Sequence, residues 1–195
     1  MFVGENMAEL IDPWASFSLD YDKLVNQFGI GKISDILDEV KNPQRLMKRG
    51  VIFGHREFNE INNLINQNKD FAVVTGMMPS GQMHIGHKMV VDQLKWYQEK
   101  GAMLSLPIAD LESYAARGMS FEKGRQIAVE EYLTNWIALG LDLEKDNVNV
   151  YLQSQNKELQ DLAFKASSKT NFSQLKAIYG FTPSTNIAHI QAPLV

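Results

Sequence analysis

The chain has 195 residues, enough for one substantial hydrophobic core, and its 45% hydrophobic and 22% charged residues are ordinary for a globular protein. No apolar stretch approaches the length of a membrane span, and the N-terminus lacks the layout of a signal peptide, so we expect a cytoplasmic protein without a membrane partner. The absence of cysteine excludes a disulfide framework and a thiolate metal site, and a net charge of −4 argues against a chain-wide surface for nucleic acid.

The first 69 residues are predicted to form an arm followed by short helices. Asp20 is a suitable cap for a helix that ends at Phe28, and Gly29 is a typical helix stop. The sequence 29–31 (GIG) has no preceding strand and no third glycine, which favours a turn between helices over a nucleotide loop. Further elements are expected as a helix at 34–40, a helix at 43–49, an extended piece at 51–53 and, after His55 and Arg56, a helix that buries Phe58, Ile61, Leu64 and Ile65.

The stretch from Phe71 to Lys95 combines a strand, a loop and a helix. Its apolar start predicts a buried strand at 71–75. A loop is marked by Gly76, Pro79, Ser80 and Gly81. A helix is predicted at 84–99, and its first amides are unpaired at the positive end of the helix dipole, which makes that end an anion site. We interpret this stretch as a nucleotide-phosphate site.

The remaining sequence alternates strands and helices. Strands are predicted at 102–109 and 148–152, and helices at 120–139, 156–169, between Thr170 and Gly180, and from about Ser184. This alternation predicts an α/β fold with a parallel sheet, in which ligands bind at the carboxyl ends of the strands. Asp110 and Glu112 follow the second strand, so they are expected near the glycine-containing loop.

His84 and His87 lie one turn apart at the start of the predicted helix, so their side chains project to the same side. Two donors there could bind nucleotide phosphates and stabilise charge on a transferring phosphorus. Gly86 between them would allow a flat ligand to approach closely. A zinc site would need a third ligand, and because only His55 and His189 remain among the histidines, we predict no protein-bound metal.

These residues carry a resemblance to a known family. Residues 79–87 (PSGQMHIGH) resemble the His-Ile-Gly-His signature of class I aminoacyl-tRNA synthetases, and 108–114 (IADLESY), with Thr75 and Gly76, point to the tryptophan/tyrosine branch. Four other segments resemble tryptophanyl-tRNA synthetases of archaeal and eukaryotic type, namely 12–14, 20–24, 49–56 and 171–181. The ordered set spans nearly the whole chain and is far more specific than the signature alone.

The resemblance implies a Rossmann-like catalytic domain that activates L-tryptophan with ATP and Mg²⁺ and transfers it to tRNA(Trp). It implies that His84 and His87 are catalytic. It implies that ATP is bound by Thr75, Gly76, Pro79, Ser80, Gly81, His84, Gly86 and His87. It implies that the amino acid is bound by Val74, Gly76, Asp110 and Glu112. Val74 and Pro107 depart from eukaryotic relatives, which carry a tyrosine and a glutamine there.

The resemblance also implies a division of the chain and a fragment of a longer enzyme. The expected parts are an N-terminal arm and helices (1–69), the first half of the catalytic domain (70–114), a connective insertion (115–183) and the start of a return to the catalytic domain (184–195). The second ATP-contacting loop is expected beyond residue 195, so the isolated chain is predicted to be inactive. The full-length protein is expected to be a homodimer, with a helix face at Tyr132, Trp136 and Leu139 as a candidate contact.

Three other functions stay open at this point. A tyrosine–tRNA ligase shares the segment at 108–114 and is the nearest alternative. A small nucleotidylyltransferase also uses a His-x-Gly-His helix start, although the helical N-terminal region argues against it. A non-catalytic binding or dimerisation role is the third.

Overall fold

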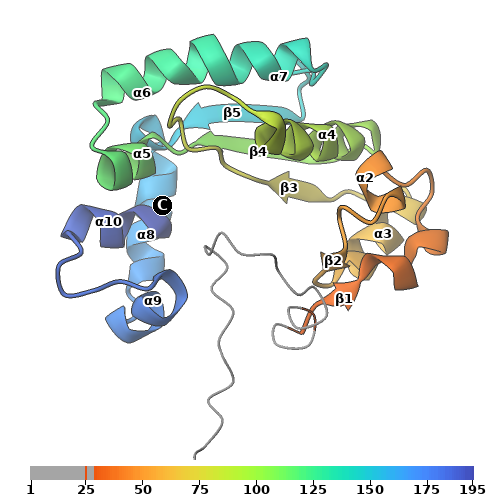
Figure 1. The fold of residues 1–195 in the computed structure, drawn as a ribbon, viewed down its shortest axis with the longest axis horizontal. Helices are drawn as coiled ribbons and strands as arrows, with labels where there is room; N and C mark the ends of the chain where they lie inside the picture. The colour runs from red at the N-terminus through yellow and green to blue at the C-terminus, as the bar shows by residue number, and fades with distance from the viewer. Residues whose placement is uncertain (1–24, 26–28) are drawn as a thin grey trace, which may run out of the picture. The chain divides into compact units, whose positions relative to one another are not determined.

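The computed structural model describes Val25 and residues 29–195 (Figure 1). Contacts within the chain divide it into two compact units on either side of the junction between Lys69 and Asp70. Of the predicted helix from Asp20 to Phe28, the described residues include Val25, which is helical, and the other positions lie outside them. Within the part of the chain that the structure describes, no helix is both long and apolar enough to span a lipid bilayer.

The N-terminal unit contains a two-stranded antiparallel sheet of β1 (Gly31–Lys32) and β2 (Gly54–His55), with Gly31 opposite His55. A side chain at Gly31 would have to displace the His55 ring, because an added Cβ would lie 2.8 Å from His55 Nε2. The predicted turn at 29–31 and extended piece at 51–53 were therefore misplaced by a few residues: the paired strands are 31–32 and 54–55.

Short helices complete this unit. The predicted helix at 34–40 is two 3₁₀ turns, η1 (Ile33–Asp35) and η2 (Leu37–Glu39), and the one at 43–49 is a single α-helical turn, α2 (Arg45–Lys48). Helix α3 (Phe58–Asn66) buries Phe58 and Ile65 as predicted, whereas Ile61 and Leu64, predicted on the same side, are only half-buried. Asn62 on the same face is 1% exposed and donates to the Glu39 carbonyl at 3.1 Å, which ties α3 to η2.

The second unit is built on three parallel strands in the order β3 (Ala72–Val74), β4 (Met103–Ile108) and β5 (Val148–Leu152). The α/β class and the parallel sheet predicted from the sequence are confirmed. Alternate residues of β4 point to opposite faces, and Leu104, Leu106 and Ile108 lie on the buried one. β5 pairs with β4 over five residues and lies within the range 115–183 that was predicted to be an insertion.

Helices connect and follow these strands. They are α4 (Ile85–Glu99), α5 (Asp110–Arg117), α6 (Phe121–Ile127), α7 (Thr134–Ala138), α8 (Lys157–Ser167), α9 (Phe172–Tyr179) and α10 (Ile187–Gln191). Ser120 caps α6 as predicted, whereas α9 is capped by Asn171 rather than Thr170, because the Asn171 side chain and Gln174 bond to each other's backbone amides. The last helix begins at Ile187, after the Asn186 cap, and not near Ser184.

Helices α6 and α7 are joined without a break by a π-helical segment, Ala128–Leu133, so that one continuous helix runs from Phe121 to Ala138 (Figure 1). Tyr132 and Trp136 of this helix are 0% exposed and belong to the core with Leu104, Leu106 and Leu141. The helix face predicted as a homodimer contact is therefore wrong for these two residues, since large apolar side chains at these positions fill the space against the sheet.

Candidate functional site

The chain continues alongside β4 after β3 has ended. Thr75 N–H donates to the Ser105 carbonyl at 3.2 Å, and Met77 exchanges bonds with the backbone of β4, donating to Pro107 and accepting from Ala109. Gly76 lies between them in close contact with β4, since an added Cβ would lie 3.2 Å from the Pro107 carbonyl oxygen and would push the two segments slightly apart. The loop is thus held at the carboxyl end of β4, where ligands bind in parallel sheets.

Two hydroxyl groups then anchor the next part of the loop. Tyr132 Oη donates to the Met78 carbonyl at 3.1 Å, and Ser113 Oγ donates to the Pro79 carbonyl at 2.6 Å. Pro79 is itself fully buried, whereas Ser80 is exposed. The loop therefore has an inner side fixed by hydrogen bonds and an exposed outer side. It is followed by Gly81, whose φ of +155° is disfavoured for residues with a side chain.

His84 and His87 form a reciprocal cap at the start of α4. The Nδ1 of His84 accepts the backbone N–H of Gly86 at 3.2 Å, and the Nδ1 of His87 accepts the backbone N–H of His84, also at 3.2 Å. The ring centroids are 4.0 Å apart. Since each Nδ1 is an acceptor, each neutral ring carries its proton on Nε2. Neither Nε2 has a partner among the residues that the structure describes, which leaves two N–H donors at a helix N-terminus.

The environment of His87 favours its neutral form. Partial burial, and secondarily repulsion from His84, lowers the pKa of His87 from its ordinary value of 6.5. The edge of its ring meets the ring of Tyr132, with centroids 5.4 Å apart and an interplanar angle of 71°. His87 is thus presented as a neutral hydrogen-bond donor at pH 7.

Gly86 has a structural role in addition to the predicted contact with a flat ligand, which stays a prediction. A Cβ at position 86 would lie 3.0 Å from Cε1 and 3.1 Å from Nδ1 of His84. A side chain at position 86 would press on the His84 ring, so glycine leaves this ring room to cap the helix.

The two carboxylates that follow β4 have different surroundings. Asp110 is 1% exposed, and its carboxylate accepts the Ser154 N–H at 3.0 Å and the Ser154 hydroxyl. Ser154 follows β5, so this pair joins the ends of two neighbouring strands. Glu112 lies exposed on α5. The Asp110 carboxylate is thus bonded within the fold, whereas the Glu112 side chain is open to solvent.

The other predicted site residues are brought to the same end of the sheet. Val74, at the end of β3, is 69% exposed, and Thr75 is half-buried beside it. Sequence reasoning missed the polar side chains that bond to the loop or to Asp110 from inside the fold, namely Ser113, Tyr132 and Ser154. For Ser154 the available signal was its position directly after a predicted strand.

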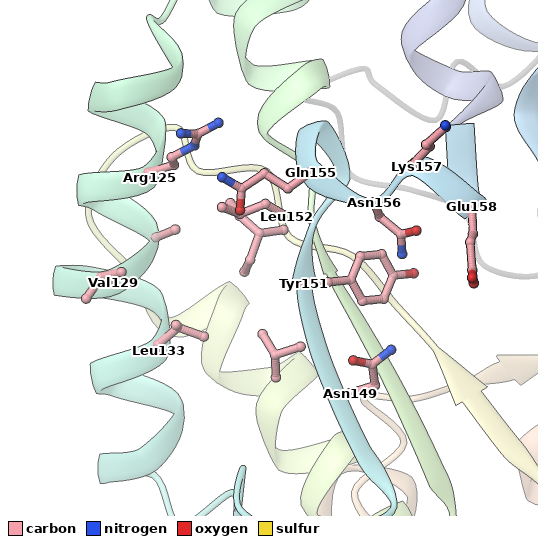
Figure 2. Close-up of a pocket in the computed structure, with 13 residues that line it drawn as sticks. Arg125, Val129, Leu133, Asn149, Tyr151, Leu152, Gln155, Asn156, Lys157 and Glu158 are labelled. Carbon is pink, nitrogen blue, oxygen red and sulfur yellow. The ribbon is translucent and has the colours of Figure 1, made fainter. Parts of the chain in front are cut away.

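A separate pocket of about 530 Å³ lies along the edge of β5. Figure 2 shows Arg125, Val129 and Leu133 facing Leu152 across it, with Tyr151 on the other side of the strand. None of its lining residues belongs to the loop after β3 or to α4, so this pocket is not the phosphate site.

Metal binding finds no support in the side-chain geometry. Within residues 29–195, no three histidine or carboxylate side chains come together as a metal-binding group.

Comparison with known proteins agrees with this geometry. The Tryptophan–tRNA ligase of Methanocaldococcus jannaschii is 52% identical over 95% of this chain, and that of Methanosarcina acetivorans is 45% identical over 92%. These matches cover 50% and 41% of the two relatives, so the chain spans about half the length of the curated relatives it matches.

Solved structures give the same result. The tryptophanyl-tRNA synthetase of Aeropyrum pernix K1 superposes with a TM-score of 0.80 at 39% identity, over 90% of this chain and 48% of that one. The enzyme from Encephalitozoon cuniculi, solved with bound tryptophan, gives 0.78 at 28% identity, over 90% and 53%. The family model for class I tRNA synthetases (W and Y) matches residues 66–194, and the chain therefore belongs to the class I tRNA synthetases of the tryptophan and tyrosine group.

Proposed function

We propose that the full-length protein is a tryptophan–tRNA ligase, which activates L-tryptophan with ATP as tryptophanyl-adenylate and transfers it to tRNA(Trp). The observation that carries this proposal is the set of archaeal relatives of that name, which are 40 to 52% identical over at least 91% of the chain. The tyrosine alternative has no comparable support among them.

The reaction requires the protein to orient the two substrates and to stabilise the charge that develops on phosphate, and it does not require a protein nucleophile. A carboxylate oxygen of tryptophan forms a bond to the α-phosphorus of ATP, and the bond from that phosphorus to pyrophosphate breaks. The Nε2–H groups of His84 and His87 would donate to phosphate oxygens as negative charge develops, and the α4 N-terminus adds its dipole. Mg²⁺ would accompany ATP as part of the substrate.

The remaining contacts to ATP follow from the shape of the loop. The exposed outer side of the loop from Thr75 to Gly81 would face ATP, and Gly86 would leave room for the His84 ring and for the close approach of adenine. This arrangement is supported by the two carbonyl anchors on the inner side of the loop, which leave the opposite side to a ligand.

For tryptophan we propose Val74, Gly76 and Glu112 as contacts. The indole offers one N–H donor and no acceptor, so a carboxylate is a suitable partner. We assign this role to Glu112, which is exposed, rather than to Asp110, whose carboxylate is already bonded to Ser154. The homodimer, the cytoplasmic location and the predicted division into parts remain predictions for the full-length protein.

The decisive experiment is pyrophosphate exchange by the full-length protein, with tryptophan or tyrosine as the amino acid, followed by charging of tRNA(Trp). We expect exchange that depends on tryptophan and on ATP with Mg²⁺. Exchange with tyrosine alone would replace the proposal by its nearest alternative, and a lack of exchange with either amino acid would leave a non-catalytic role.

A further inference from the structure

Tyr132 connects the core of the second unit to the candidate site. Its side chain is 0% exposed, yet it touches two parts of the site that lie about fifty residues earlier in the sequence. Its hydroxyl donates to the Met78 carbonyl at 3.1 Å, and its ring meets the ring of His87 at 5.4 Å. No motif in the sequence marks this residue, and the chemistry at the two histidines does not use it directly.

The helix around Tyr132 is wound so that this side chain stays on the buried face. The buried residues recur at every fourth position, as Gly124, Ala128, Tyr132 and Trp136. In a regular α-helix each four-residue step turns by about 40° more than a full circle, so such a series would drift off one face. The wider π-helical turn at 128–133 compensates for the drift. π-Helical insertions are frequently found at functional sites.

The two contacts of Tyr132 act on consecutive parts of the site. The Met78 carbonyl lies within the loop from Thr75 to Gly81, and His87 lies on the helix that follows this loop. Ser113 holds the neighbouring Pro79 carbonyl from α5, but it does not touch the histidines in any contact found among the described residues. Tyr132 therefore contacts both the loop, at Met78, and the first turn of α4, at His87.

We propose that Tyr132 is a positioning residue for the nucleotide site: its hydroxyl fixes the loop after β3 and its ring fixes the orientation of His87. The catalytic part of this inference rests on the proposed function. The contact between the Tyr132 ring and His87 does not, and it can be tested without activity.

The catalytic test is Tyr132→Phe in the full-length protein, which removes one hydroxyl and keeps the ring. Losing this hydrogen bond is expected to lower kcat for tryptophan-dependent exchange roughly five- to tenfold, with KM for tryptophan changed less than about twofold. The matched control is Tyr97→Phe. Tyr97 lies near the other end of α4, thirteen residues after the His84 cap and therefore about 20 Å from it along the helix. Equal losses of kcat in both variants would overturn the proposal.

The structural test is ¹⁵N NMR of the imidazole nitrogens of His87 through a pH titration. In the wild-type and Tyr132→Phe proteins the Nε2–H tautomer is expected to persist. In Tyr132→Leu, which removes the ring that shields His87 from water, the pKa of His87 is expected to rise toward 6.5. An unchanged titration in a folded Tyr132→Leu protein would overturn the ring contact. If the wild-type protein shows no exchange, the proposed function fails while this test still decides the structural part.

Discussion

Asp110 and Ser154 join the ends of β4 and β5: both oxygens of the buried carboxylate accept hydrogen bonds from Ser154, one from its backbone N–H at 3.0 Å and one from its hydroxyl. The Ser154 hydroxyl also accepts a bond from the Arg125 guanidinium at 3.3 Å. A carboxylate that is 1% exposed is thereby supplied with donors on both oxygens. The pair fixes the relative position of two strand ends beside the candidate site.

Ser154→Ala should therefore destabilise the protein. It leaves one oxygen of a buried carboxylate without a donor, which costs about 1.5–3 kcal/mol of unfolding free energy because the acceptor is charged. Urea unfolding followed by circular dichroism gives the value. The control is Ser168→Ala, an exposed serine that bonds only within its own helix end, with an expected change below about 0.5 kcal/mol. Equal stability of the two variants would show that the Ser154 hydroxyl does not support Asp110.

Gly86→Ala should separate helix stability from ligand binding. Alanine favours a helix by about 0.5–1 kcal/mol over glycine, so the variant should not be less stable through propensity alone. Its Cβ would nevertheless push the His84 ring, which lies 3.0 Å away, by a few tenths of an ångström from its capping position. We expect ATP affinity of the full-length protein, measured by calorimetry, to fall about tenfold, the equivalent of one lost hydrogen bond.

The control for this change is Gly124→Ala, also within a helix. A Cβ there would lie 3.9 Å from Pro79 Cγ, an ordinary contact that leaves the histidines undisturbed. Its ATP affinity should remain at the wild-type level. Unchanged affinity in Gly86→Ala would mean that the His84 cap does not contribute to the site.

Much of the fold was predictable because its signals are local. β5 was predicted with its correct ends, since Val148 to Leu152 alternates between apolar and polar residues, and Ser120 marked the start of a long helix. The π-helical segment was not predicted, because it is set by packing of Tyr132 and Trp136 against the sheet. The histidines were found through a motif, whereas Ser154 was missed because its partner lies 44 residues away.

Stability should decrease below pH 6.5 through His87. The pKa of His87 is lowered in the folded state, so below 6.5 the unfolded chain binds a proton that the folded chain does not. The contribution of His87 to the free energy of unfolding is complete above pH 6.5 and is lost as the pH falls toward the lowered pKa. In His87→Asn, which keeps an acceptor for the His84 N–H without a titrating ring, urea midpoints should depend less on pH between 6.5 and 5. An identical pH dependence in both proteins would contradict this prediction.

His87→Ala should affect the chemical step more than substrate binding. If the Nε2–H of His87 strengthens its bond as charge develops on phosphate, its removal lowers kcat for adenylate formation while the dissociation constant for tryptophan stays nearly constant. A loss of roughly 10²-fold in kcat is the expected size for one such donor. Single-turnover kinetics and tryptophan titration of the full-length protein measure the two quantities. The reverse pattern, with tryptophan binding lost and kcat retained, would assign His87 to substrate recognition.

Glu112→Gln should weaken tryptophan binding without weakening the fold. Glu112 is exposed on α5, so its charge contributes little to stability, but as an acceptor for the indole N–H it would form a charge-assisted bond worth about 1.5–3 kcal/mol. KM for tryptophan should rise by roughly three- to tenfold, because the glutamine oxygen still accepts the indole N–H but without the negative charge, and KM for ATP should be unchanged. Glu122→Gln is the matched control, because Glu122 is an exposed carboxylate in the first turn of the next helix, α6. A different result would overturn this assignment: Glu112→Gln behaves like the control, while Asp110→Asn raises KM for tryptophan in a protein of normal stability. The indole N–H would then donate to Asp110, and the bonds from Ser154 to Asp110 would have to open when tryptophan binds.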